Sequence, residues 1–177
     1  MANETEHDID TPSPWVCRFA PRIRPGGLVL DVACGGGRHA RYLAGLGYRV
    51  EAVDRDPGLV RGIAGVNVLA ADLEAGQWPY AGRQFDAVVV VNYLHRPLFP
   101  RLLAALAPGA LLIYETFATG NERFGRPCNP DFLLRHGELL DLARDRLQIL
   151  AYEDLQVDAP RPAKVQRICA VNEKSGV

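Results

Sequence analysis

Apolar runs of strand length alternate along this chain with segments in which apolar residues recur at helical spacing. The run that begins at Leu28, together with runs at 48–54, 66–72, 85–91 and 110–116, predicts five strands. Helical spacing predicts helices over 15–23, 38–46, 57–64, 97–107 and 132–143. This alternation is typical of a parallel sheet covered on both faces, so we predict an α/β protein with a doubly wound, Rossmann-like sheet.

The C-terminal part of the chain departs from this alternation. Residues 147–157 and 164–172 predict two more strands, and only the short proline-containing stretch 158–162 joins them. A connection of that length cannot hold a crossover helix, so the two strands must pair antiparallel. The sequence therefore predicts five βα units followed by a hairpin.

A glycine-rich turn, Gly35-Gly36-Gly37, joins the first predicted strand to the first helix after it. Glycines let the backbone bend sharply and let a ligand approach amide groups that a Cβ would shield. The helix that follows has unpaired N–H groups and a partial positive charge at its start. The turn thus predicts a site for a nucleotide-like cofactor.

Acidic residues end the second and third predicted strands. Asp54 lies nineteen residues beyond Gly35, a spacing at which a carboxylate in a βαβ unit accepts both ribose hydroxyls. Capping of the next helix is the alternative role for Asp54, although Asp56 suits it better. Asp72 ends the third strand, where it could accept from an adenine amine or simply be an exposed loop acid.

Asp31 separates two classes of cofactor. The stretch from Gly35 to Ala40 satisfies the loose glycine pattern of dinucleotide-binding proteins. However, a carboxylate four residues before Gly35 would lie close to a pyrophosphate, whereas it suits a ligand with a positive centre such as an ammonium or a sulfonium. The closing hairpin is also foreign to the usual dinucleotide fold.

Length and composition indicate one globular domain. The chain has 177 residues, 48% hydrophobic and 23% charged, with a net charge of −1, so nothing favours nucleic acid or an anionic membrane as partner. We expect a flexible N-terminal tail at 1–14 and a single domain at 15–177. The four cysteines are too far apart for a zinc site, which predicts free thiols, no metal and a cytoplasmic location.

Four motifs in order resemble the class I S-adenosylmethionine-dependent methyltransferases, and within them the small bacterial TehB-like and UbiE-like branch. They are the stretch 29–37 as the first motif, Val53-Asp54 as the ribose motif, 71–73 as the adenine motif and 85–92 as the fourth-strand motif. The resemblance implies a seven-stranded sheet of order 3-2-1-4-5-7-6 with strand 7 antiparallel. It also implies S-adenosylmethionine as cofactor and S-adenosylhomocysteine as product.

The same resemblance implies a set of cofactor-binding residues. Asp31 and the backbone from Ala33 to Gly37 would hold the methionine part, and the segment that begins at Val91 would lie beside the methyl group. The full predicted set is Asp31, Ala33, Cys34, Gly35, Gly37, Asp54, Arg55, Asp72, Leu73, Val91 and Asn92.

Residues that follow the fourth and fifth strands are candidates for the acceptor side. Methyl transfer is an in-line displacement, so alignment matters most and a base is needed only if the acceptor must lose a proton. The predicted catalytic residues are Tyr93, His95 and Arg96, with His95 either a base or a structural residue. The predicted substrate residues are Glu115, Phe117 and Arg126, the last two belonging to the long loop 117–130. Arg96 and the loop arginines Arg123 and Arg126 could hold an anionic acceptor.

The predicted function is methyl transfer from S-adenosylmethionine to a small-molecule or chalcogen-oxyanion acceptor, by a monomer or homodimer. The alternative is a protein that binds S-adenosylmethionine or S-adenosylhomocysteine without catalysis, as a sensor or accessory subunit. An NAD-linked oxidoreductase ranks third, because Asp31 and the hairpin oppose it.

Overall fold

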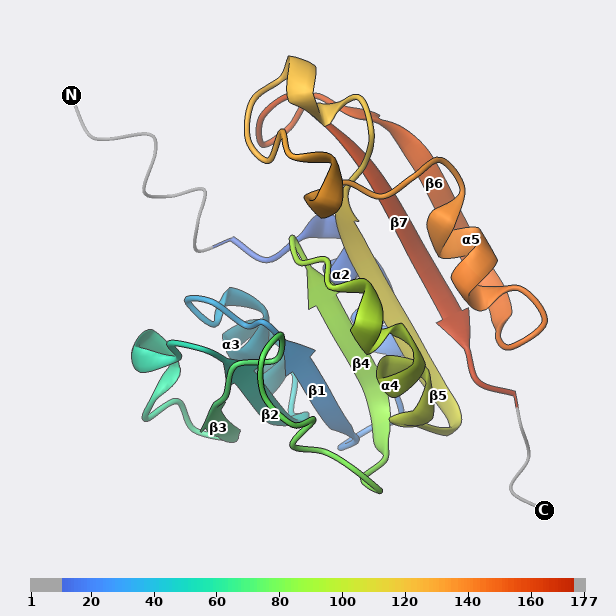
Figure 1. Ribbon diagram of the computed structural model, residues 1–177. Coiled ribbons are helices and arrows are strands. Elements are labelled where there is room, and N and C mark those ends of the chain that lie inside the picture. The colour runs from blue at the N-terminus through green and yellow to red at the C-terminus, as the bar shows by residue number, and fades with distance from the viewer. Residues whose placement is uncertain (1–10, 174–177) are drawn as a thin grey trace.

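One seven-stranded sheet organises the computed structural model, which describes residues 11–173 (Figure 1). Its order is β3-β2-β1-β4-β5-β7-β6; β1 to β5 pair parallel, and β7 is antiparallel to both β5 and β6. This confirms the predicted order and the terminal hairpin. The strands are β1 Leu28–Val32, β2 Arg49–Asp54, β3 Val66–Ala70, β4 Phe85–Val91, β5 Leu106–Phe117, β6 Gln148–Val157 and β7 Ala163–Val171.

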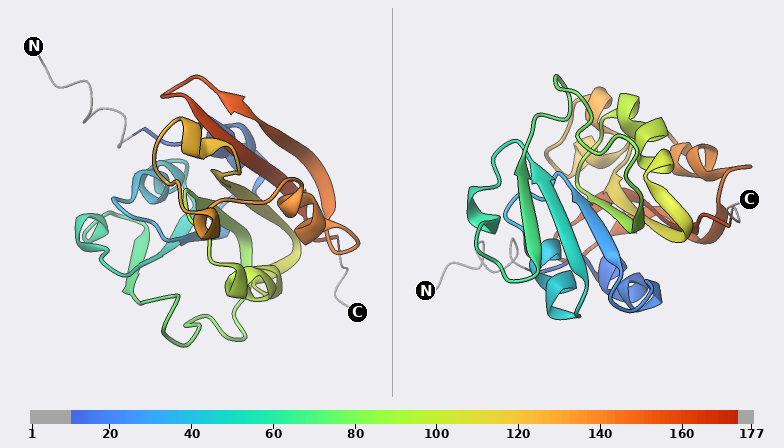
Figure 2. Two further views of the ribbon diagram at one scale, coloured as in Figure 1. Left: turned by 45° about the horizontal axis from the view of Figure 1, so that its top comes forward. Right: turned by 90° about the horizontal axis from the view of Figure 1, so that it is seen from below.

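Helices cover both faces of the sheet (Figure 2). On one face α2 Pro14–Phe19 and α3 Arg38–Gly45 pack through Trp15 and Leu43. On the other face α4 Phe99–Ala104 and α5 Glu138–Ala143 pack through Leu102 and Leu139. None of the helices in the described range 11–173 is long and apolar enough to cross a membrane.

The central strand β4 shows why the apolar runs became buried strands. Val88 and Val90 belong to the core under α4 and α5, whereas Val89 and Val91 belong to the core under α2 and α3. A strand buried on both faces needs an almost continuous apolar sequence, which Phe85–Val91 supplies. The chain therefore leaves β4 at the middle of the edge formed by the carboxyl ends of the strands, between the two layers of helices.

Three predicted helices are corrected by the structure. The segment 57–64 forms only the 3₁₀ turn Gly58–Val60, because Gly62 is left-handed at φ 84° and Val60 is the turn's only buried residue. The segment 132–143 is helical only in α5, since left-handed Gly137 precedes that helix and Leu134 is drawn into a bridge with Ala118.

The third corrected helix is 97–107. It divides into the 3₁₀ turn Arg96–Leu98 and α4, and it ends at Ala104 because Leu106 already pairs with Phe85 in the sheet. Strand β5 thus begins at Leu106, earlier than predicted, and the register between β4 and β5 is irregular next to that pair.

The described chain starts beside the carboxyl ends of the strands. Residues 1–10 of the predicted tail lie outside the described residues. Farther on, Arg38 donates to the Thr11 carbonyl (3.2 Å), and Ser13 donates its backbone N–H to His39 Nε2 (3.1 Å). Ser13 also caps α2 by accepting from the Trp15 amide. The start of the described chain is therefore tied to α3.

Candidate functional site

The glycine turn after β1 has the left-handed backbone that its sequence predicts. Gly35 lies at φ 51° and Gly37 at φ 77°, and Ala33 shares this region at φ 55°. A Cβ on Gly37 would stand 2.7 Å from Val60 Cγ2, whereas a Cβ on Gly35 would meet nothing within 4 Å. Open space beside Gly35 leaves its backbone free for a ligand, while Gly37 is needed for close packing.

Asp31 is a buried acid directly beneath this turn. Its side chain is 1% exposed, and its Oδ2 atom has no hydrogen-bond partner among the described residues. Burial raises its pKa from 3.8 to about 7, and the Ala40 backbone amide and the charge of Arg38 offset part of that rise. A buried carboxyl with an unused oxygen is a natural partner for a cationic ligand group.

Asp54, at the end of β2, faces the same turn. Its Oδ2 accepts the Gly35 amide at 2.9 Å, and its Oδ1 accepts the Asp56 amide at 3.0 Å. Each carboxylate oxygen can accept a second bond, so capacity remains for hydroxyl donors. These contacts place the predicted ribose acid against the glycine turn.

Asp72, after β3, is exposed at the same edge. Its Oδ1 accepts the amides of Glu74 (2.9 Å) and Ala75 (3.2 Å), and these two bonds lower its pKa. The neighbouring Leu73 is 8% exposed and belongs to the core beneath. The structure thus presents an ionised acid on a fixed loop, next to a buried apolar residue.

The residues after β4 enter the site from its other side. Asn92 is exposed, and its backbone N–H donates to the Glu115 carbonyl. Its left-handed backbone, at φ 56°, turns the chain sharply out of the sheet. Burial raises the Tyr93 pKa, and the carboxylates of Glu74, Asp72 and Asp54 raise it further. The Tyr93 phenol therefore lies near these three acids. Because its pKa is raised, the phenol remains protonated at neutral pH.

His95 is half-buried, and it is near enough to Asp72 to contribute to the lowering of the Asp72 pKa. The histidine therefore stands on the same side of the site as Asp72 and Tyr93.

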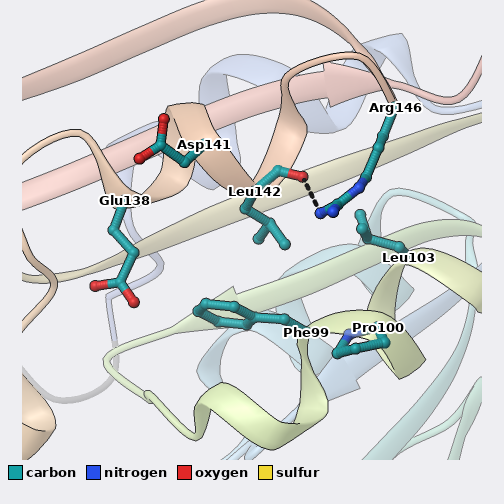
Figure 3. Close-up of a pocket in the computed structure, with 7 residues that line it drawn as sticks. All are labelled: Phe99, Pro100, Leu103, Glu138, Asp141, Leu142 and Arg146. Carbon is teal, nitrogen blue, oxygen red and sulfur yellow. Dashed lines mark hydrogen bonds between the residues drawn. The ribbon is translucent and has the colours of Figure 1, made fainter.

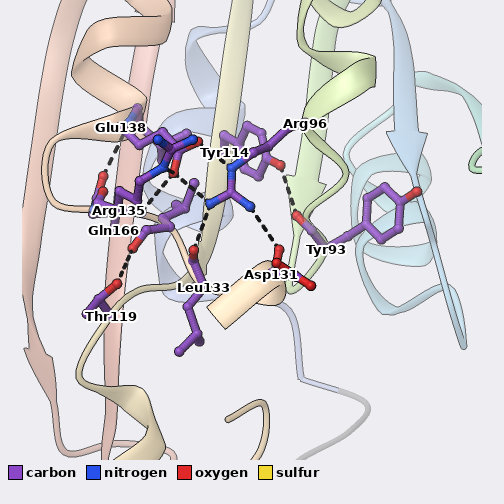
Figure 4. A network of polar contacts seen from close by, with 11 residues as sticks. Tyr93, Arg96, Tyr114, Thr119, Asp131, Leu133, Arg135, Glu138 and Gln166 are labelled. Atoms are coloured by element: carbon purple, nitrogen blue, oxygen red, sulfur yellow. Dashed lines mark hydrogen bonds and ion pairs between the residues drawn. The ribbon is translucent and has the colours of Figure 1, made fainter. Parts of the chain in front are cut away.

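Arg96 does not fit the catalytic role predicted for it, because its donors are committed to the protein (Figure 4). Its Nε and Nη2 bind Glu138 Oε1 (2.6 Å) and Oε2 (2.9 Å), a bidentate pair. Its Nη1 donates to the Asp131 carbonyl (2.9 Å), and Nη2 also donates to the Leu133 carbonyl (2.8 Å). Tyr93 points away from this network (Figure 4).

Among the three predicted substrate residues, Glu115 is engaged within the protein. It accepts from Ser13 Oγ (2.7 Å) and from Arg167 Nη1 (3.1 Å). Phe117 is half-buried at the end of β5, and Arg126 is exposed on the following loop. The structure leaves Arg126 the freest of the three to meet a ligand.

Cys34 is buried in the turn, and burial together with Asp31 and Asp54 raises its pKa to about 12. A thiol with that pKa is no nucleophile at neutral pH. Among residues 11–173 there is no group of three or more His, Cys, Asp or Glu side chains that could hold a metal ion.

A cleft of about 480 Å³ lies elsewhere, between α4 and α5 (Figure 3). Phe99, Leu103 and Leu142 form its apolar walls, and Asp141 and Arg146 stand at its rim. Its lining includes none of the residues of the glycine turn or of the acids after β2 and β3. We therefore place the candidate site at the carboxyl ends of the strands and not in this cleft.

Three features of the site carried little or no sequence signal. Glu138 and Asp131 lie 42 and 35 positions from Arg96, and no motif links them. Glu74 sits among exposed loop residues. For Ser13 the signal was present, since a serine before Pro14 is a typical helix cap, but its bonds to His39 and Glu115 are long-range.

Comparisons with known proteins agree with this geometry. Residues 29–109 match the family model described as "Methyltransferase domain". Together with the sheet order, this match confirms the resemblance to class I S-adenosylmethionine-dependent methyltransferases. The matched segment holds the glycine turn, the acids after β2 and β3, and the residues after β4. No curated protein matches the chain significantly.

Solved structures share the fold at low identity. TehB from Haemophilus influenzae is 19% identical with a TM-score of 0.75, covering 91% of this chain and 62% of its own. A TehB-like S-adenosylmethionine-dependent methyltransferase from Corynebacterium glutamicum is 19% identical, with coverages of 89% and 86% and a TM-score of 0.65. A 1,6-didemethyltoxoflavin-N1-methyltransferase from Burkholderia thailandensis, with 1,6-didemethyltoxoflavin and S-adenosylhomocysteine bound, is 19% identical, with coverages of 95% and 82% and a TM-score of 0.64. At these identities the likeness shows the fold.

Proposed function

We propose that this protein transfers a methyl group from S-adenosylmethionine to a small-molecule acceptor. The observation that carries the proposal is the buried Asp31 carboxyl beneath an open glycine turn, with an oxygen that no described residue uses. A ligand with an ammonium and a sulfonium fits such a site, because an opposite charge stabilises the ionised carboxylate there. The methyltransferase-domain match over 29–109 supports the same reading.

The residues present would hold the cofactor in three places. Asp31 and the backbone of the turn would hold the methionine part, Asp54 the ribose hydroxyls, and Asp72 with Leu73 the adenine. Bound there, S-adenosylmethionine supplies a methyl carbon already activated by its sulfonium leaving group. The chain's own contribution is then to align the acceptor and to exclude water.

Proton transfer at this site would fall to few groups. Tyr93 has a raised pKa, so at neutral pH its phenol donates a hydrogen bond and does not act as a base. His95, which follows β4 and contributes to lowering the Asp72 pKa, would accept a proton from an acceptor whose nucleophile is an O–H, N–H or S–H group. An acceptor that is already anionic would need no base.

The small-molecule class of acceptor is supported by relatives of this fold. One structural relative holds the planar heterocycle 1,6-didemethyltoxoflavin, and another, coclaurine N-methyltransferase, is bound to N-methylheliamine and S-adenosylhomocysteine. The chalcogen-oxyanion acceptor, the monomer or homodimer state, the absence of a nucleic-acid substrate and the cytoplasmic location stay predictions.

Calorimetric titration with S-adenosylmethionine, S-adenosylhomocysteine and NAD tests the cofactor. We expect micromolar binding of both adenosyl ligands, none of NAD, and a loss of at least about tenfold in Asp54→Ala, which removes the acceptor of two hydroxyls. Asp56→Ala is the matched control, since it removes an exposed neighbouring acid but keeps the amide that bonds Asp54. Binding of NAD alone, or equal losses in both variants, would refute the assignment.

Catalysis is separated from mere binding by product formation. S-adenosylhomocysteine should accumulate when the protein meets S-adenosylmethionine and an extract of small metabolites, and it should not accumulate with His95→Gln if the acceptor must be deprotonated. Tight adenosyl binding with no turnover on any fraction would favour the alternative of a sensor or accessory subunit.

A further inference from the structure

The loop that follows β5, residues 118–134, is anchored by polar side chains. Its two ends are joined where Ala118 bridges Leu134. Asn121, 2% exposed, accepts the Lys164 amide (3.1 Å) and donates to the Pro127 carbonyl (3.0 Å). Gln166, fully buried, donates to the Arg135 carbonyl (2.6 Å) just beyond the loop. These bonds hold the loop from inside the protein.

Two aromatic side chains of the same loop point outward. Phe124 is 37% exposed and Phe132 is 50% exposed. The other exposed side chains of this loop are mostly polar, and its leucines are buried, so these two rings are the loop's large exposed apolar groups. Phe124 is partly covered by the Arg123 guanidinium, whose carbon lies 5.7 Å from the ring centroid. Within residues 11–173, Phe132 has no cation–π or aromatic ring contact.

The backbone at Phe132 is held more firmly than an exposed residue requires. Arg96 donates to the carbonyls of Asp131 and Leu133, the residues on either side of it (Figure 4). The Phe132 amide donates to the Asn129 carbonyl (3.0 Å), which closes the 3₁₀ turn Pro130–Phe132. Glu138 in turn fixes the Arg96 guanidinium from α5.

This arrangement lies next to the candidate site. Arg96 directly follows His95 at the end of β4, and Figure 1 shows the loop beyond the same ends of β4 and β5. A half-exposed ring held rigidly beside a catalytic edge resembles the wall of a binding site, in which an apolar surface is left open for a ligand. Rigid placement also lowers the entropy that the ligand must overcome on binding.

We propose that Phe132 contacts the methyl acceptor through its exposed ring face, and that Arg96 is the positioning residue that fixes Phe132 there. The acceptor is then a molecule with an apolar, planar face. This inference deepens the proposed function and rests on it. Because the Arg96 guanidinium is already bound to Glu138 and two carbonyls, Arg96 then acts through Phe132 and does not contact the reacting groups.

Binding of the aromatic probe 8-anilinonaphthalene-1-sulfonate, followed by its fluorescence with S-adenosylhomocysteine present, tests the proposal. The exposed half of a phenylalanine, about 100 Å², predicts that Phe132→Ala weakens probe affinity about tenfold or more. Phe124→Ala, which removes the other exposed ring of the same loop (37% exposed against 50% for Phe132), should alter affinity less than about twofold. Equal losses in the two variants, or no loss in Phe132→Ala, would overturn the proposal.

A double-mutant cycle separates positioning from general structural support. Arg96→Gln should weaken probe binding in the wild type, yet add little in the Phe132→Ala background, because the arginine acts through that ring. Additive losses would contradict the positioning role. If Arg96→Gln fails to fold, the comparison of Phe132→Ala with Phe124→Ala still decides whether the ring binds.

Failure of the proposed function gives a different result. Calorimetry would then show no S-adenosylhomocysteine binding to the wild type, whatever the probe does. Normal S-adenosylhomocysteine binding to Phe132→Ala, with probe binding unchanged, would overturn the role of the ring alone.

Discussion

Asp31→Asn should make the protein more stable, and the gain should grow with pH. The buried carboxyl of Asp31 has a pKa of about 7 in the folded protein, against 3.8 ordinarily. The unfolded chain therefore releases this proton more easily, and ionisation favours unfolding. The cost to the folded state is fully present above pH 7, falls as the pH drops, and vanishes below about 3.8. This sign is the reverse of that for a salt-bridged acid.

The magnitude follows from linkage. Ionisation of Asp31 destabilises the fold by about 4 kcal/mol at pH 8 and by about 2 kcal/mol at pH 5. Asparagine does not titrate. The free energy of unfolding of Asp31→Asn minus that of the wild type should therefore rise by about 2–3 kcal/mol between pH 5 and pH 8. A constant offset from the new amide is compatible with this, because only the change with pH carries the prediction.

Urea unfolding of both proteins at pH 5, 6, 7 and 8, followed by tryptophan fluorescence, measures that difference. Asp56→Asn, a change of an exposed acid, should follow the wild type at every pH. Parallel stability curves for the wild type and Asp31→Asn would refute the reasoning, since they would mean that the Asp31 carboxyl ionises in the folded state as easily as in the unfolded one.

The remaining predictions concern the same turn and its ligand. Affinity for S-adenosylhomocysteine should fall by up to about tenfold per pH unit below 7, because its ammonium group requires ionised Asp31; calorimetry in two buffers of different ionisation enthalpy detects the proton released. Gly37→Ala, which forces a methyl group against Val60 at 2.7 Å with φ at 77°, should lower stability by about 2–4 kcal/mol, whereas Gly36→Ala should be nearly neutral in denaturant melts. Iodoacetamide at pH 8 should modify exposed Cys128 and spare Cys34, as peptide mass mapping will show.

The sheet was predictable because its signals are local. Each central strand is a continuous apolar run, and the short link at 158–162 allows only an antiparallel hairpin, as found. The sheet order came from the family resemblance and not from these patterns. Helix 57–64 was predicted wrongly because Gly62 adopts a left-handed conformation there. Helix 132–143 was predicted too long because Leu134 pairs with Ala118, a contact that spacing does not reveal.

Site residues that follow strand ends were predictable from the sequence. The hydrogen-bond partners of those residues were not, where the partners lie far away in the sequence. Asp54 lies against Gly35 as the βαβ spacing suggests. By contrast, Arg96 looked available for an anionic acceptor, since its sequence neighbours give no hint that Glu138 and two distant carbonyls take its donors. Glu115 is occupied in the same way by Ser13 and Arg167. Sequence position predicts which edge a side chain reaches, but not which partners satisfy it.

Asp31 and Asp54 show how two acids in one site serve different needs of a ligand. Asp54 already accepts two backbone amides, so its charge is stabilised and its remaining lone pairs suit neutral hydroxyl donors. Asp31 has an unused buried oxygen and a raised pKa, so it gains most from a cation. A pyrophosphate at the turn would face both carboxylates and gain from neither. The same pair that suits a cationic adenosyl ligand therefore disfavours a dinucleotide.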